Sequence, residues 1–485
     1  MRITNCLPRL PSKSIQTQST GGTSSLLARL DRILTARHVL YVFVAFMAWL
    51  TDSFNIFVVS LSLKRLSVQY GIGSLEELSL ALSLTHLFRS AGAFVFGLMA
   101  DRFGRRWLLT LNMLGMSGTV LGTTFILDYS DFLVVRGLFA FFLGGTYGTA
   151  VALALENLPT HTLGFVSGFF QHGYYLGYFL AGGFDMNVVT PLNNWRVSFY
   201  AGSGLSFLTA AICVMCPDSE IYIQLRQGER LYPDPHRPSM GRSFLRSLRA
   251  AISNHWRRTI YCVLLLTAFH SISRISQDSY QKFAIVNKKM SVENTALLGM
   301  IGIGGSMIGT IVGGWLSQCL GRRITIIMMC TFAGAFVPLW ILPVTFPGLA
   351  LGVFWLQFFL QGAWGVLPIY ISELSPSGCI ATFVGLTYNL GHLFSSAAPI
   401  LQQRAIELTH YTIYDVDMYQ YGLAQAILFG SLAGFIVLLT IFGHEEHGTV
   451  LRSVGGAMWD DSKSNSLRSL EDDGSPTDRL GERIR

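Results

Sequence analysis

Ionisable side chains interrupt several long apolar stretches of this sequence. They are Asp52, Arg89, Arg136, His172, His270, Arg274, Asp278 and His392. A charged side chain at the centre of a lipid-embedded helix costs about 2.5–3.5 kcal/mol by insertion scales, so such residues are functional candidates by default. A guanidinium can bind a carboxylate through two parallel hydrogen bonds, and a carboxyl group can carry a proton. These residue types therefore predict a site for a small organic anion and a proton.

The densest polar group lies between residues 270 and 278. His270, Arg274 and Asp278 are spaced four residues apart, and Ser273 and Gln277 fall beside them. In a helix this spacing makes one face polar for about two turns. Because such a face is costly against lipid, we expect it to line an enclosed interior.

The elements that must position these residues are apolar runs of about 20 residues, the length that crosses a hydrocarbon core of about 30 Å as a helix. Apolar residues make up 51% of the 485-residue chain and charged residues only 13%, whereas soluble proteins carry about 25% charged residues. The sequence predicts twelve membrane-spanning helices, at 38–62, 78–100, 107–127, 132–155, 162–184, 196–216, 259–281, 294–318, 324–345, 349–372, 380–401 and 423–443.

Basic residues indicate the orientation of these spans. With both termini in the cytoplasm, most of the 35 Lys and Arg residues fall on the inside, as the positive-inside rule requires. The net charge of +7 is explained by this topology and does not indicate a nucleic-acid partner.

We expect disordered cytoplasmic tails at 1–37 and 444–485. Because Lys13 and Lys463 are the cytoplasmic lysines in this topology, we predict that ubiquitin-dependent turnover acts on them.

Two polar motifs of the first half of the chain recur in the second half. The loop 97–106 recurs as 314–323, and Glu156 recurs as Glu373, both at an offset of 217 residues. A shared offset predicts two six-helix halves related by an axis along the membrane normal. The predicted halves are 38–216 and 259–443, joined by a cytoplasmic linker at 217–258.

The loop Gly97-x-x-x-Asp101-Arg102-x-Gly104-Arg105-Arg106 resembles the signature loop of the major facilitator superfamily. The resemblance implies an all-α membrane fold of twelve helices that works by alternating access around a site near the bilayer midplane. Asp101 and the arginines can pair with Glu156 when the inside is shut; alternatively, the arginines only set the topology. The predicted gating residues are Gly97, Asp101, Arg102, Gly104, Arg105, Arg106, Glu156, Gly321, Arg322, Arg323 and Glu373.

The stretch from His270 to Lys282 resembles the seventh-helix signature N-x-x-[S/T]-H-x-[S/T]-Q-D-x-x-x-[S/T] of fungal Jen-type monocarboxylate:proton symporters, in the sialate:proton symporter family. Further similarity covers 135–139, 154–159, 167–178, 365–376 and 381–388. The sequence departs from the signature at His270, Arg274 and Lys282. Asn389 and His392 correspond to an expected amide-bearing pair on the eleventh helix, where His392 is another departure.

This resemblance implies that Arg136, Ser167, Gln277 and Asp278 help to bind a small carboxylate and move a proton. The predicted substrate-binding residues are Arg136, Ser167, His270, Ser273, Arg274, Gln277, Asp278, Asn389 and His392, and the predicted proton-coupling residues are Asp52 and Asp278.

Several alternatives remain open for these side chains. Arg136 can instead form a permanent ion pair with an acidic neighbour such as Asp52. Arg274 can hold Asp278 ionised, which leaves Asp52 as proton carrier, Arg274 as a second anion anchor, or coupling lost. His270 either restores a titratable group or is a packed polar residue.

We therefore predict a plasma-membrane proton symporter for small monocarboxylates such as lactate or pyruvate, working as a monomer in the lipid bilayer. The alternatives are a carrier of a dicarboxylate or sialic acid, and a non-transporting nutrient sensor. We expect no enzymatic activity, cofactor or metal, because the sequence lacks a phosphate-binding Gly-rich loop and a cluster of His and Cys with metal spacing.

Overall fold

The protein is described by a computed structural model. The structure describes residues 36–71, 75–219, 223, 240–277, 280–376, 378–413, 416–419, 421–443 and 445, with side chains except at 75–84, 240–254 and 410–419. Predictions for Asp278, for Lys13 and Lys463, and for most of both tails fall outside these residues.

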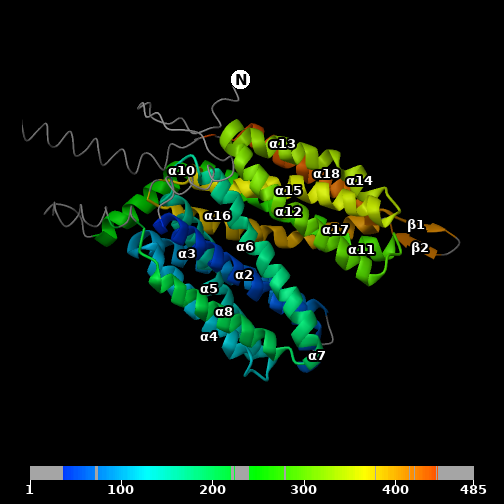
Figure 1. Ribbon diagram of the computed structural model, residues 1–485, viewed down its shortest axis with the longest axis horizontal. Coiled ribbons are helices and arrows are strands. Elements are labelled where there is room, and N and C mark those ends of the chain that lie inside the picture. The colour runs from blue at the N-terminus through cyan, green and yellow to red at the C-terminus, as the bar shows by residue number, and fades with distance from the viewer. Residues whose placement is uncertain are drawn as a thin grey trace, which may run out of the picture.

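Helices of the first part of the chain form one bundle, the N bundle (Figure 1). In chain order they are α2 (Ala36–Gln69), α3 (Leu75–Phe103), α4 (Arg105–Thr123), α5 (Tyr129–Glu156), α6 (Leu163–Phe184), the π-helical turn η2 (Asp185–Val189), α7 (Thr190–Leu192) and α8 (Arg196–Met215). Within this bundle α2 packs against α6, α3 against α5, and α4 against α8.

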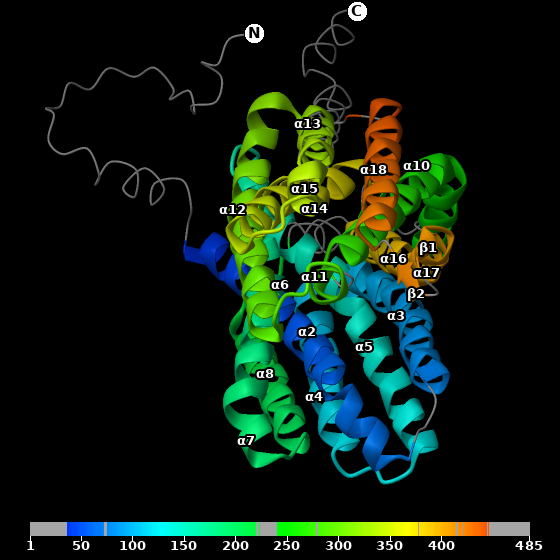
Figure 2. The same cartoon turned by 90° about the vertical axis from the view of Figure 1, so that its right-hand side faces the viewer.

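Helices of the remaining chain form the C bundle (Figure 2). They are α10 (Met240–Gln277), α11 (Tyr280–Val286), α12 (Val292–Leu320), α13 (Arg322–Ala335), α14 (Val337–Ile341), α15 (Phe346–Leu374), α16 (Ile380–Phe394), the 3-10 turn η3 (Ser395–Ala397), α17 (Ala398–Leu408) and α18 (Tyr421–Ile441). The bundles meet where α16 packs against α3 and α5, and where α12 packs against α6.

The predicted fold class is confirmed, with one small addition. Each of the twelve predicted spans coincides with one helix or with consecutive helical segments among the described residues. The addition is an antiparallel hairpin of β1 (His410–Ile413) and β2 (Val416–Tyr419), which lies between α17 and α18. Its strands are too short to alter the helical architecture.

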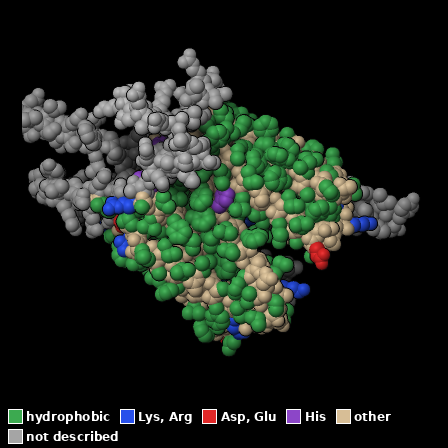
Figure 3. Space-filling view, viewed as in Figure 1, with side chains coloured by type: hydrophobic (Ala, Val, Ile, Leu, Met, Phe, Trp, Pro, Cys, Tyr) green, Lys and Arg blue, Asp and Glu red, His purple; other side chains and the backbone are tan. Residues whose placement is uncertain are grey.

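The outer surface is suited to lipid. Seven helices of the described part are long and apolar enough to cross a membrane, and large apolar side chains such as Phe207, Ile308 and Leu438 are more than half exposed. Hydrophobic side chains cover most of the visible face, and charged ones gather toward the ends of the bundles (Figure 3). An apolar belt of this kind matches the hydrocarbon core of a bilayer, and the charged ends match the aqueous regions on its two sides.

Two glycines give both bundles the same backbone turn. Gly104 separates α3 from α4 with φ 103° and ψ 153°, and Gly321 separates α12 from α13 with φ 97° and ψ 161°. Only glycine adopts such positive φ values without strain. The repeat read from the sequence is therefore also present in the backbone.

Part of the predicted linker is helical. Residues 240–258, assigned to the linker by sequence, are continuous with α10, and non-helical torsions at His255 mark a kink. A helix in this part of the linker fits its composition, because arginine is a good helix former.

Candidate functional site

A cavity of about 160 Å³ lies between the two bundles. Helices α2, α3, α5 and α6 line it on one side, and α10, α15 and α16 line it on the other. It extends to Leu63, near the end of α2, and to Phe132, near the start of α5. The cavity therefore reaches toward the end of the molecule that carries α7, α11 and the hairpin, which we call the opposite face.

Arg136 contributes a cation to the cavity wall. The residue is 5% exposed, its guanidinium carbon lies 4.0 Å from the centre of the Phe139 ring, and its Nη1 has no hydrogen-bond partner among the described residues. Asp52 pairs instead with Arg89, with 3.2 Å between Oδ2 and Nη2. The alternative of a permanent Arg136–Asp52 ion pair is thus absent from the described side chains.

Three histidines meet beside the cavity. The ring centres of His86 on α3 and His392 on α16 are 4.5 Å apart, and His270 on α10 lies 4.8 Å from His392. Arg274 approaches the first pair, with Nη2 3.5 Å from His86 Nε2 and 3.3 Å from His392 Nδ1. Arg274 itself does not appear on the described cavity wall.

The remaining predicted substrate residues divide into two groups. Gln277 and Ser273 line the cavity, and Ser273 accepts a hydrogen bond of 2.8 Å from the Trp364 indole. Ser167 is fully buried away from it, donating to the Gly365 carbonyl at 2.7 Å. Asn389 also lies off the wall, and its amide donates to the Gly385 and Gly144 carbonyls. Ser167 and Asn389 therefore join helices in this conformation.

Aromatic rings close the cavity at its inner end. Tyr147 of the N bundle stacks on Tyr388 of the C bundle with ring centres 3.7 Å apart. Trp49 packs against both rings, at 4.9 Å and 5.8 Å. We call these three residues the aromatic seal, since they separate the cavity from the end of the molecule that carries the repeated motif.

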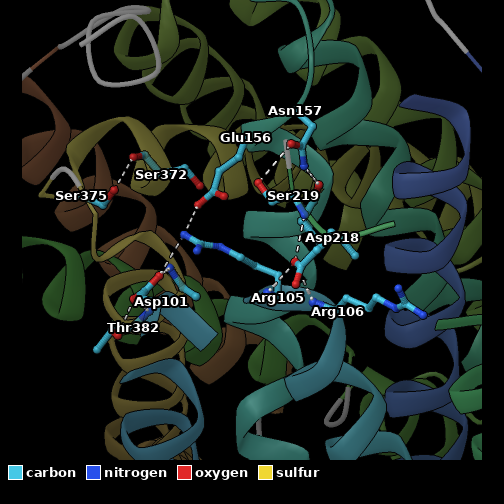
Figure 4. Close-up of polar contacts among 12 residues, drawn as sticks. Asp101, Arg105, Arg106, Glu156, Asn157, Asp218, Ser219, Ser372, Ser375 and Thr382 are labelled. Carbon is cyan, nitrogen blue, oxygen red and sulfur yellow. Dashed lines mark hydrogen bonds and ion pairs between the residues drawn. The ribbon is translucent and has the colours of Figure 1, made fainter. Parts of the chain in front are cut away.

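That end, which we call the motif face, is held shut by Asp101 (Figure 4). The carboxylate of Asp101 accepts hydrogen bonds from the backbone N–H of Ala381 at 3.1 Å, the backbone N–H of Thr382 at 2.9 Å and the Thr382 hydroxyl at 2.6 Å. These donors lie at the N-terminus of α16, where free N–H groups and the helix dipole favour an anion. Asp101 thus links the two bundles.

Arg105 holds Asp101 in this position. Its Nη2 lies 3.3 Å from Asp101 Oδ1 and 2.9 Å from Glu156 Oε1, and all three side chains are almost fully buried. Gly97 lies alongside, where a Cβ atom would come within 2.7 Å of Thr382 Cα. Glycine at this position therefore lets α3 approach α16 closely.

The second copy of the motif forms a similar pair. Arg322 makes a two-pronged ion pair with Glu373, at 3.1 Å and 3.0 Å, and also donates to Ser317. Acidic residues cap the helix that follows each turn: Asp218 accepts from the backbone of Arg105, and Glu445 from that of Arg322.

Three other predicted gating arginines have different contacts. Arg106 and Arg323 donate to backbone carbonyls at the ends of α8 and α18. Arg102 lies over the ring of Phe103, with 5.0 Å from its guanidinium carbon to the ring centre. None of these three contacts crosses between the bundles.

Residues 39–399 match the family described as Major Facilitator Superfamily. The chain belongs to this superfamily. It is therefore a multi-pass membrane transporter and not an enzyme.

The chain is similar in sequence to two named proteins and in fold to a solved structure. A carboxylic acid transporter protein homolog of Saccharomyces cerevisiae is 26% identical over 434 residues, covering 86% of this chain and 69% of that protein. The sialic acid transporter NanX of Escherichia coli is 24% identical over 418 residues, covering 85% and 95%. The solved structure of the proton:xylose symporter XylE superposes with a TM-score of 0.66 at 14% identity, covering 87% of this chain and 99% of that one.

This major facilitator transporter is closed at one face and hollow toward the other. The bundles lie together at the motif face and diverge toward α7 and α11 (Figure 1). The cavity lies on the diverging side of the aromatic seal. In the predicted orientation, this is an outward-facing conformation.

Sequence reasoning missed several residues of the cavity. His86 was absent from the candidate ionisable residues although it lies one helical turn before Arg89, and this spacing was the signal that could have identified it. Gln361 and Trp364 on α15 also line the wall. Their neighbourhood carries the family resemblance, but neutral side chains in an apolar run give no signal of their own.

Proposed function

We propose that this transporter carries small monocarboxylates such as lactate or pyruvate together with protons across the plasma membrane. The observation that carries the proposal is Arg136, a buried guanidinium on the cavity wall without an acidic partner among the described side chains. An uncompensated buried cation is costly unless an anion arrives to pair with it. Similarity to the carboxylic acid transporter protein homolog of yeast supports a carboxylic acid as that anion.

The proposal includes the orientation and the gate. Both termini would lie in the cytoplasm, with the boundaries of the two halves as predicted from sequence. Asp101, which pairs with Arg105, would break its hydrogen bonds with α16 when the cytoplasmic side opens, and the ion pair of Arg105 with Glu156 would be disturbed. Rocking of the bundles would then expose Arg136 to the cytoplasm and release the anion.

A transport assay tests the substrate and the coupling. We expect transporter-deficient cells expressing this chain to accumulate radiolabelled lactate and pyruvate more than acetate, succinate or sialic acid, and a protonophore to abolish accumulation. Preference for succinate or sialic acid would select the other carriers instead. No uptake of any of the five acids, with the protein at the cell surface, would favour the sensor.

Arg136 provides the residue-level test. Arg136→Lys keeps the charge but loses the planar fork that binds two carboxylate oxygens, so we expect the half-saturation concentration to rise about tenfold or more. Arg404→Lys, on an exposed arginine paired with Glu407, is the matched control. An unchanged half-saturation concentration in Arg136→Lys would show that this guanidinium has a structural role.

A further inference from the structure

The described wall of the cavity carries imidazoles but no carboxylate. His86, His270 and His392 line it, and its described residues include no Asp or Glu. Asp52 is fully buried behind this wall and is paired with Arg89, which does line the cavity. Imidazole is the side chain whose charge changes most readily near neutral pH.

The contact with Arg274 defines the protonation of two of these rings. A guanidinium has only donors, so His86 Nε2 and His392 Nδ1, at 3.5 Å and 3.3 Å from Arg274 Nη2, must accept. Each ring is therefore neutral in this conformation. Protonation of an accepting nitrogen would replace its hydrogen bond with a contact between two donors.

Fixed positive charge surrounds this pair of rings from several elements. Helix α10 contributes Arg274, α3 contributes Arg89, and α5 contributes Arg136 from the cavity wall; α10 also contributes the titratable His270. Around the pair, α2 contributes the negative charge of Asp52, which Arg89 already partners, while α15 presents the neutral Gln361 and Trp364. The charges at this site therefore oppose a proton unless an anion is present.

We propose that the His86–His392 pair is the proton-binding site of transport, loaded when a carboxylate occupies the cavity. One imidazole lone pair takes a proton from water to give an imidazolium, and the bound carboxylate offsets its charge. By linkage, the proton strengthens binding of the anion to the same extent. Because His86 belongs to the N bundle and His392 to the C bundle, rocking of the bundles changes their contact, which provides for proton release. This inference rests on the proposed carboxylate transport.

The main test replaces both imidazoles and measures purified full-length protein in liposomes. We expect His86→Gln/His392→Gln to lose the acid stimulation of pyruvate uptake between about pH 7.5 and about pH 5.5, and to lose uphill accumulation, while exchange of external for internal pyruvate continues. His172→Gln is the matched control, because His172 is a buried histidine that contacts Gly168 and Thr310 outside the cavity wall.

A second variant tests the role of the fixed charge. Arg274→Gln removes the cation that faces both rings, so they should accept a proton at lower acidity. We expect the midpoint of acid stimulation to move to higher pH by about one unit or more. A midpoint that stays in place or moves to lower pH would overturn the proposal.

The outcomes separate this inference from the proposed function. Acid-stimulated, uphill uptake that persists in the double glutamine variant would overturn the histidine site and leave proton-coupled transport standing. Loss of exchange in both the double variant and the single His86→Gln variant would also overturn it, because the pair would then serve binding or folding. Uptake by the unaltered protein that does not respond to pH would overturn the coupling itself.

Discussion

The two copies of the repeated motif share one scaffold but make different contacts. Both have a glycine turn, a buried Arg–Glu ion pair and an acidic cap on the following helix. Among the positions at which the copies differ, one bears on the interface: it is Asp101 in the N bundle and Gln318 in the C bundle. Asp101 accepts three hydrogen bonds from α16 across the interface, whereas Gln318 donates one, of 3.0 Å, to the Thr160 carbonyl.

This difference places the stronger contact between the bundles in the first copy of the motif. A carboxylate at a helix N-terminus interacts with both the free N–H groups and the dipole, while a neutral amide contributes a single ordinary hydrogen bond. In the N bundle Arg105 is shared between two carboxylates, but in the C bundle Arg322 is committed to Glu373. The first copy therefore links the bundles strongly and the second mainly stabilises its own bundle.

The largest expected effect is on stability in the second copy. Arg322→Ala leaves Glu373 buried without its partner, so we expect the free energy of unfolding to fall by about 3–5 kcal/mol. Denaturation of the purified protein in mixed micelles measures it. Arg404→Ala, which removes an exposed ion pair, should cost less than about 1 kcal/mol. Equal losses in the two variants would contradict the structural role of Arg322.

The next effect is on the gate in the first copy. Asp101→Asn weakens charge-assisted hydrogen bonds to α16 by about 2 kcal/mol, which should open the motif face about thirtyfold more often. Cys379, beside this contact, is a native reporter, since burial raises the pKa of its thiol to about 11. Opening the face lowers that pKa toward its usual range and exposes more thiolate, the reactive form.

Alkylation measures this opening in a variant that keeps Cys379 as its single thiol. We expect Asp101→Asn to speed the reaction with a maleimide, while Asp128→Asn, at the exposed start of α5, should not change it. An unchanged rate in Asp101→Asn would show that the closure of this face depends on other contacts.

A smaller effect is expected at the corresponding position of the second copy. Gln318→Ala removes one neutral hydrogen bond, worth about 1 kcal/mol, so the alkylation rate of Cys379 should rise about fivefold at most. If this variant opens the motif face more than Asp101→Asn does, the second copy, and not the first, would make the stronger contact between the bundles.

The smallest effect should come from Ser167, for which resemblance and structure suggest different roles. Because Ser167 bonds to Gly365 and lies off the cavity wall, Ser167→Ala should leave the half-saturation concentration for pyruvate unchanged and alter the maximal rate by less than about fivefold. Initial-rate uptake distinguishes the two roles. A large rise in the half-saturation concentration would support direct binding of substrate by Ser167.

Much of the fold could be predicted because its signals are local. Apolar runs of spanning length mark the helices, and the 217-residue offset relates Arg105 to Arg322 without any knowledge of packing. The start of α10 was harder to predict from the sequence, because the helix before His255 contains no apolar run.

The pairing of buried charges could not be predicted in the same way. The sequence suggested Arg136 as a possible partner of Asp52, and the pairing with Arg89 instead depends on how α2, α3 and α5 pack. The grouping of His86 with His392 likewise joins residues from opposite bundles. Spacing along one helix gives no information about such contacts, which depend on tertiary structure.

The aromatic seal has a consequence for energy conservation in the cell. Tyr147 and Tyr388 belong to different bundles and stack at 3.7 Å, so the motion that opens the motif face must also part them. Stacked aromatic rings leave no room between them for a chain of hydrogen-bonded water molecules, which is the route by which protons cross. Protons therefore do not leak between these rings and lower the membrane potential while the transporter is in this conformation.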